Sequence, residues 1–173
     1  MGYVSPPLKA YFDQLTNKNL RILIPGAGKG WEVAYLHGLG FLHVVYLDVA
    51  PEAAVIFQNH CPGFESSNII IGDFFAHQGQ YDLIVEQTFF CALPPASRKD
   101  YVHKTHALLK AGGKIVGLLF NHPFSHKGPP YGGNPEEYRE LFKEKFTFKT
   151  FESAYNSIAP RQNREHFVIF EKK

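Results

Sequence analysis

Residues 22–33 read I-L-I-P-G-A-G-K-G-W-E-V. A run of branched apolar side chains gives way to glycines at positions 26, 28 and 30, after which apolar residues return at roughly helical spacing. This pattern predicts a buried strand, a tight loop and a helix, the first unit of a parallel α/β sheet. Glycine is needed where the backbone takes a positive φ or approaches a ligand closely, so the loop is a candidate binding site.

Similar apolar runs recur along the rest of the chain and predict seven strands and four main helices. The predicted strands span residues 20–25, 43–48, 68–72, 81–86, 114–120, 146–152 and 165–170, and the predicted helices span 31–39, 51–60, 96–110 and 135–143. No helix separates the last two strands, which can therefore pair antiparallel. We predict an α/β, doubly wound three-layer sandwich of the Rossmann-like type, with a mostly parallel seven-stranded sheet whose last strand is antiparallel. Gly112-Gly113 is expected to form a turn, and residues 1–7 read as a loop.

Length and composition narrow the classes of function. A chain of 173 residues suits a single domain, and its loop-like opening leads us to expect a short N-terminal segment upstream in the natural protein. The net charge of +2 is small and the basic residues are scattered, which does not indicate nucleic acid or an acidic membrane as a partner. We expect a small-molecule substrate. The longest apolar run, residues 115–120, is too short to cross a bilayer. We expect a cytoplasmic protein without a metal site, because the two cysteines form no C-x-x-C pattern. We expect a monomer, because no long apolar stripe is left over.

Three classes of ligand use a glycine-rich loop after the first strand, and spacing separates them. A phosphate-binding P-loop requires Lys and then Ser or Thr, whereas Lys29 is followed here by Gly30. The dinucleotide fingerprint G-x-G-x-x-G requires glycine where Trp31 stands, and an indole there would obstruct helix–strand packing. The P-G-A-G sequence of residues 25–28 fits the E/D/P-x-G-x-G pattern of S-adenosylmethionine-binding loops. The spacing therefore favours S-adenosylmethionine as the ligand, and a dinucleotide stays open as the alternative.

Acidic residues follow two neighbouring strands of the predicted sheet. Asp48 closes the second strand and can accept hydrogen bonds from both hydroxyls of a ribose. Asp73 and Phe74 follow the third strand, where the carboxylate and the ring can meet the amino group and the face of an adenine. Each feature alone is commonly plain turn or capping chemistry. Their order along three successive strands points to a nucleoside cofactor.

Four motifs further along the chain are specific enough to indicate a family. They are E-Q-T-F-F-C-A-L-P-P at residues 86–95, G-P-P-Y at 128–131, P-E-E-Y at 135–138 and Y-N-S-I-A-P-R at 155–161. In this order, over essentially the whole chain, they resemble the thiopurine S-methyltransferase superfamily, above all its thiol, halide and thiocyanate methyltransferase branch. The resemblance implies a class I methyltransferase that uses S-adenosylmethionine.

The same resemblance implies a set of cofactor-binding residues. They are Gly26, Ala27, Gly28, Asp48, Asp73, Phe74 and Gln87. The chain departs from the family at two places. Plant relatives tend to have Asp-Tyr where Glu86-Gln87 stands here. Relatives also carry tryptophans just upstream of the stretch that matches residues 2–7, whereas Trp31 is the only tryptophan of this chain.

Transfer of a methyl group to a soft anion needs positioning more than a general base. Phe89, Phe90 and Phe120 lie at strand ends and are predicted to line a dry aromatic substrate pocket. Tyr131 lies in the long Pro/Gly-rich stretch 121–134, which has the character of a lid, and its hydroxyl is the candidate catalytic group. The alternative, to which we give equal weight, is that Tyr131 only packs this loop against the rest of the domain.

Two histidines and a cysteine complete the candidates near the predicted site. His122 and His126 flank the lid and could act as a base for a thiol, and Cys91 reads as a small buried apolar residue. The function predicted is methyl transfer from S-adenosylmethionine to a thiol, thiopurine, thiocyanate or halide. A dinucleotide-dependent oxidoreductase and a non-catalytic cofactor-binding module remain the alternatives.

Overall fold

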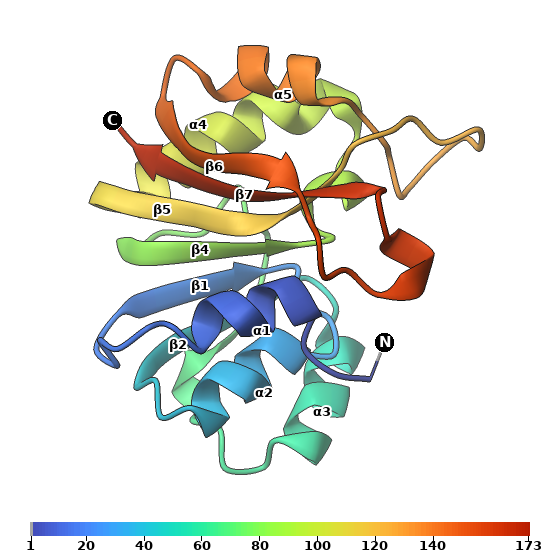
Figure 1. Cartoon of the computed structure of the whole chain (residues 1–173). Helices are drawn as coiled ribbons and strands as arrows, with labels where there is room; N and C mark the ends of the chain where they lie inside the picture. Colours follow the sequence, from blue (N-terminus) through green and yellow to red (C-terminus); the bar gives the residue numbers. More distant parts are fainter. Residues whose placement is uncertain (1) are drawn as a thin grey trace.

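A seven-stranded sheet forms the centre of the molecule (Figure 1). The structure is a computed structural model and describes residues 2–173. The strands are β1 (Arg21–Pro25), β2 (His43–Asp48), β3 (Ile69–Ile71), β4 (Tyr81–Gln87), β5 (Leu109–Phe120), β6 (Phe146–Ser153) and β7 (Glu165–Lys172). They lie in the order β3-β2-β1-β4-β5-β7-β6, and β7 runs antiparallel to both of its neighbours. The predicted architecture is confirmed.

Helices cover both faces of this sheet (Figure 1). One face carries α1 (Pro6–Phe12), α2 (Trp31–Gly38) and α3 (Pro51–His60), and the other carries α4 (Arg98–Leu108) and α5 (Pro135–Phe142). Short 3-10 turns occur at Ser66–Asn68, Phe90–Ala92, Pro95–Ser97 and Ala159–Arg161. Among residues 2–173, no helix has the length and apolar character needed to span a membrane.

Burial on both faces explains the uninterrupted apolar runs of the sequence. Ile22 and Ile24 of β1 pack into the core beneath α1, α2 and α3, whereas Leu23 between them packs into the core beneath α4 and α5. Side chains of a strand alternate between faces, so a strand covered on both sides is apolar at every position.

At two places the prediction differs from the structure by more than two residues at an element's end. Residues 6 and 7, read as the end of a loop, instead open α1, where the Pro-Pro pair suits a first helical turn. β5 begins at Leu109 rather than Lys114, and its register against β4 shifts between Tyr81 and Leu83. The expected Gly112-Gly113 turn is therefore an irregularity inside a longer strand, where Gly112 takes a φ of +70°.

The strand order reverses between β1 and β4. The chain runs outward from β1 to β2 and β3 on one side, then returns to place β4 on the other side of β1. In open α/β sheets, ligands bind beyond the carboxyl ends of the strands at such a switch point. The glycine loop follows β1 directly and therefore lies at this position.

Candidate functional site

The glycine loop approaches the turn after β4 with no space for a side chain. Gly26 has a φ of +59°, and a Cβ atom on it would lie 2.4 Å from Cδ2 of Phe89. Gly28 has a φ of +54°, but a Cβ on it would meet nothing nearer than the carbonyl oxygen of Gly26, at 4.0 Å. The first glycine is thus required by packing, whereas the second leaves open space beside the loop.

Asp48, at the end of β2, fixes this loop. Its Oδ2 accepts a hydrogen bond from the backbone N–H of Gly28 at 2.8 Å, and its Oδ1 accepts one from the N–H of Ala50 at 2.9 Å. The hydroxyl of Tyr46 donates to the carbonyl oxygen of Gly28 at 2.7 Å. The carboxylate is half-buried and keeps free lone pairs, so it can accept further hydrogen bonds from a ligand.

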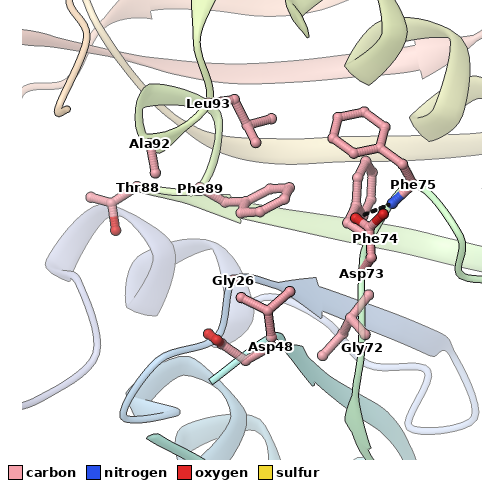
Figure 2. Close-up of a pocket in the computed structure, with 12 residues that line it drawn as sticks. Gly26, Asp48, Gly72, Asp73, Phe74, Phe75, Thr88, Phe89, Ala92 and Leu93 are labelled. Atoms are coloured by element: carbon pink, nitrogen blue, oxygen red, sulfur yellow. Dashed lines mark hydrogen bonds between the residues drawn. The ribbon is translucent and has the colours of Figure 1, made fainter. Parts of the chain in front are cut away.

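A largely apolar cavity of about 360 Å³ opens beside Asp48 (Figure 2). It lies at the ends of β1 to β4, and we call it the apolar compartment. Its lining residues are Gly26, Leu47, Asp48, Val49, Gly72, Asp73, Phe74, Phe75, Thr88, Phe89, Ala92 and Leu93. Oδ1 of Asp73 accepts a hydrogen bond from the N–H of Phe75 at 3.0 Å, which sets the turn after β3 (Figure 2). Acidic groups and aromatic rings thus face one cavity from three strands.

A second cavity, of about 320 Å³, adjoins the first and is mostly polar. We call it the polar compartment. Its lining residues are Tyr3, Gly26, Ala27, Gly28, Lys29, Trp31, Glu32, Gln87, Thr88 and Arg161. Gly26 and Thr88 line both compartments, so the two cavities are neighbours at these residues. We call the two compartments together the cleft.

A buried carboxyl group shapes the turn after β4. Glu86 is 1% exposed, and its Oε1 accepts hydrogen bonds from the N–H groups of Phe89 and Phe90, both at 2.8 Å. The hydroxyl of Tyr101 donates to Oε2 at 2.8 Å. Burial raises the pKa of Glu86 to about 7, although these three donors oppose the shift. The carboxyl group thereby holds the backbone that places the ring of Phe89 against Gly26.

Thr88, in the same turn, has a φ of +63°. A β-branched residue in the left-handed region is strained, and such strain is common where a backbone is held for function. The hydroxyl of Thr88 donates to the carbonyl oxygen of Gln87 at 2.6 Å. Sequence reasoning selected neither Glu86 nor Thr88 as a site residue. For Thr88, the reason is that a threonine gives no sequence signal for a positive φ.

The three phenylalanines predicted to form the substrate pocket separate in the structure. Phe89 lines the apolar compartment. Phe90 is 1% exposed and packs edge-on against Tyr101 and Tyr138, so it belongs to the core rather than to a pocket wall. The half-buried Phe120 ends β5 outside both linings, with its ring 5.0 Å from that of Phe124. Two of the three predicted pocket residues thus lie apart from the cleft.

The predicted lid, residues 121–134, covers a separate cavity of about 360 Å³. Tyr131 lines this cavity, together with His126 and Arg98, and does not line the cleft. The backbone N–H of Tyr131 donates to the carbonyl oxygen of Cys91 at 2.6 Å. Arg98 donates to the carbonyl oxygen of Gly132 at 2.6 Å, so side-chain and backbone contacts hold the loop against the domain.

The histidine and cysteine candidates near the lid have structural partners. Nε2 of His122 accepts from the guanidinium of Arg164 at 3.0 Å, and Nδ1 lies 3.2 Å from the carbonyl oxygen of the same residue. Cys91 is buried, and burial raises the pKa of its thiol to about 12, which keeps it protonated near neutral pH.

Comparison with known proteins agrees with this geometry. The family model described as "Thiopurine S-methyltransferase (TPMT)" matches residues 1–172. A probable thiol methyltransferase 2 from Arabidopsis thaliana is 30% identical over 179 residues, which cover 99% of this chain and 78% of that protein. A thiopurine S-methyltransferase from Acinetobacter baylyi is 30% identical over 171 residues, 84% of this chain and 77% of that protein.

Solved structures show the same fold at lower identity. A TehB-like SAM-dependent methyltransferase from Corynebacterium glutamicum superposes with a TM-score of 0.74 at 19% identity, over 96% of this chain and 88% of that one. A Burkholderia thailandensis 1,6-didemethyltoxoflavin-N1-methyltransferase, solved with bound S-adenosylhomocysteine, gives a TM-score of 0.73 at 18% identity, over 97% of this chain and 77% of that one. Since the family model spans nearly every residue and a 30%-identical relative covers 99% of the sequence, the chain belongs to the thiopurine S-methyltransferase family and is an S-adenosylmethionine-dependent methyltransferase.

Proposed function

We propose that the cleft at the carboxyl ends of β1, β2 and β4 binds S-adenosylmethionine and that the methyl acceptor is a small soft nucleophile: a thiol, a thiopurine, thiocyanate or a halide. The observation that carries the proposal is the bond between Asp48 and the N–H of Gly28, because it joins the glycine loop to an acid that still has free lone pairs. The names of the relatives support a sulfur acceptor, since they include thiol, thiopurine and thiocyanate methyltransferases.

The residues of the apolar compartment fit the nucleoside part of this cofactor. Asp48 offers acceptors for the two hydroxyls of a ribose, and the exposed Asp73 offers one for the amino group of an adenine. Phe74 and Phe75 supply aromatic surface on the same wall. We therefore assign Gly26, Ala27, Gly28, Asp48, Asp73, Phe74 and Gln87 to cofactor binding.

The chain's own contribution to the reaction is positioning and exclusion of water. S-adenosylmethionine, when bound, supplies a methyl group on a positively charged sulfur. The ring of Phe89 closes the apolar compartment beside Thr88, where the two compartments meet. A thiolate or thiocyanate that loses its water shell beside such a ring becomes a stronger nucleophile, and no general base is then required. Phe120 is proposed to bound the acceptor from outside the two linings, since its ring centre lies 5.4 Å from the guanidinium carbon of Arg161 on the polar compartment. Tyr131 lines the neighbouring cavity under residues 121–134, and its hydroxyl is proposed to reach the acceptor from that loop.

The test measures S-adenosylhomocysteine formed from S-adenosylmethionine with hydrosulfide, an alkyl thiol, an aromatic thiol, thiocyanate and iodide. Product that depends on the acceptor is expected, and the ranking of kcat/KM values identifies the acceptor class. Tyr131→Phe should lower kcat for the preferred acceptor without changing the affinity for S-adenosylhomocysteine. Binding of S-adenosylhomocysteine without turnover of any acceptor would contradict the proposed chemistry. An unchanged kcat in Tyr131→Phe would remove only the role of that hydroxyl.

A further inference from the structure

Arg161 is the only arginine among the residues that line the polar compartment. It ends the 3-10 turn Ala159–Arg161, just before β7, and its side chain is 24% exposed. Nη1 lies 3.6 Å from Oε2 of the buried Glu165, and the guanidinium carbon lies 5.4 Å from the centre of the Phe120 ring. Contacts to an acid and to a ring hold the guanidinium in place while leaving it access to the cavity.

A buried acid lines the same compartment. Glu32, in the first turn of α2, is 7% exposed, and its Oε1 accepts from the N–H of Ser5 at 3.1 Å. Burial raises the pKa of this carboxyl group, and Arg161 is among the groups that oppose the shift. Lys29 is the other cation on this lining, and it is exposed.

Two further polar groups of this lining are buried and lack partners among residues 2–173. They are the indole Nε1 of Trp31, a donor, and the amide Oε1 of Gln87, an acceptor. Buried polar atoms without a partner are uncommon in native structures, and a ligand that supplies the partner is one explanation for those that line a cavity. One donor and one acceptor are thus left open beside a cation and an acid.

This combination matches a zwitterion and not a phosphate. The α-amino acid group carries a carboxylate and an ammonium on one carbon, so it needs a cation and acceptors in the same small cavity. A pyrophosphate would gain from Arg161 but would meet the carboxyl group of Glu32 in the same cavity, with like charges opposed.

We infer that Arg161 binds the α-carboxylate of the methionine part of S-adenosylmethionine, and that Glu32 and Gln87 accept from its ammonium group. The inference rests on the proposed binding of the cofactor in the cleft. A ligand whose nucleoside lies in the apolar compartment reaches the polar one past Gly26 and Thr88, which line both.

The test compares two ligands that differ in the amino acid part. Calorimetric titration measures the Kd of S-adenosylhomocysteine, which has that part, and of 5′-methylthioadenosine, which lacks it. Arg161→Gln should weaken binding of S-adenosylhomocysteine by about 10- to 100-fold, the range for loss of a charge-assisted hydrogen bond. Binding of 5′-methylthioadenosine should not change. Arg161→Lys should recover part of the loss, because it keeps the charge but not the forked geometry.

Arg139→Gln is the matched control. Arg139 also stacks over a phenylalanine, with its guanidinium carbon 4.6 Å from the centre of the Phe151 ring, but it lies on α5 outside the cleft. This variant should bind both ligands like the wild type.

Each other outcome has a distinct meaning. Unchanged S-adenosylhomocysteine affinity in Arg161→Gln overturns the role of Arg161 and leaves the proposed function intact. Equal losses for both ligands also overturn it, because Arg161 would then support the fold or the nucleoside site. If the wild-type protein binds neither ligand, the proposed cofactor site itself is wrong, and the inference falls with it.

Discussion

The ring of Phe89 lies so close to Gly26 that a Cβ atom on the glycine would fall 2.4 Å from Cδ2 of the ring. The loop after β1 and the turn after β4 therefore touch directly where the two compartments meet. Because Glu86 holds the backbone of Phe89, any change that moves one of these three residues should alter the shape of the cleft.

Gly26→Ala should weaken binding of S-adenosylhomocysteine by at least ~10-fold, because the new methyl group displaces Phe89 and the φ of +59° is strained for alanine. Gly40→Ala is the matched control, since Gly40 also has a positive φ, +81°, but a Cβ there meets nothing within 4 Å. It should lose stability through backbone strain alone and keep its affinity. Calorimetric titration of both variants with S-adenosylhomocysteine measures the two affinities. Equal affinities would show that the contact between Gly26 and Phe89 is irrelevant to binding.

Asp48→Asn should reduce the affinity for S-adenosylhomocysteine by about 10- to 100-fold, since the amide keeps one acceptor oxygen but loses the charge that strengthens bonds to hydroxyls. Asp82→Asn serves as control. Asp82 likewise accepts a backbone N–H, that of Arg21 at 2.8 Å, but lies near the start of β4, away from the cleft. Isothermal titration with the two variants should separate them, and a loss shared by both would point to a general effect of charge.

Glu86→Gln should change how stability depends on pH. The pKa of Glu86 is raised from 4.5 to about 7, so between these values the folded protein binds more protons than the unfolded chain. The free energy of unfolding of the wild type should therefore fall as pH rises from about 4.5 to 7, by at most about 1 kcal/mol per pH unit from this group. Glu86→Gln should lack this contribution. Urea unfolding at a series of pH values measures it, and parallel profiles for the two proteins would assign the slope to another group.

Phe89 and Phe90 should respond differently to truncation. Phe90→Ala should cost about 3–5 kcal/mol of unfolding free energy, as expected for a buried phenylalanine in a packed core. Phe89→Ala should cost less, because its ring is only partly buried, and should mainly weaken cofactor binding. Chemical denaturation together with ligand titration distinguishes the two effects. A larger stability loss in Phe89→Ala than in Phe90→Ala would reverse the assignment of core and pocket.

The sequence predicted those elements whose bounds are set by neighbouring residues in the chain. The bounds of β2 and α3 agree with the sequence prediction, because a branched apolar run ends in Asp48 and a proline opens the next helix. The glycine loop and the acid after β2 were identified for the same reason, since both lie next to a clear strand. Their mutual hydrogen bond follows from the parallel pairing of β1 with β2.

The features that the sequence did not predict depend mainly on contacts between segments that are distant in the chain. α1 has only seven residues and is held by packing of Leu8 and Phe12 on the sheet, which a short proline-rich sequence does not reveal. Phe89 and Phe90 are chemically identical neighbours, and the hydrogen bonds that both backbone N–H groups donate to the buried carboxyl group of Glu86 fix the turn that directs one ring to the cavity and the other to the core. Arg161 ends the motif at residues 155–161 that contributes to the family resemblance, but the motif alone assigns no role to its side chain, and its position on the cleft depends on how the turn before β7 packs.

The bond from Ser5 to Glu32 joins the segment before α1 to the wall of the polar compartment, and the side chain of Asn156 donates to the carbonyl oxygen of Pro6 at 3.4 Å. Two stretches that are 150 residues apart in sequence thus meet beside the ligand cavity. Local opening of either stretch would expose that cavity, so occupancy by a ligand and closure of these segments are thermodynamically linked. Saturation with S-adenosylhomocysteine should therefore slow amide hydrogen exchange and proteolytic cleavage at both stretches together.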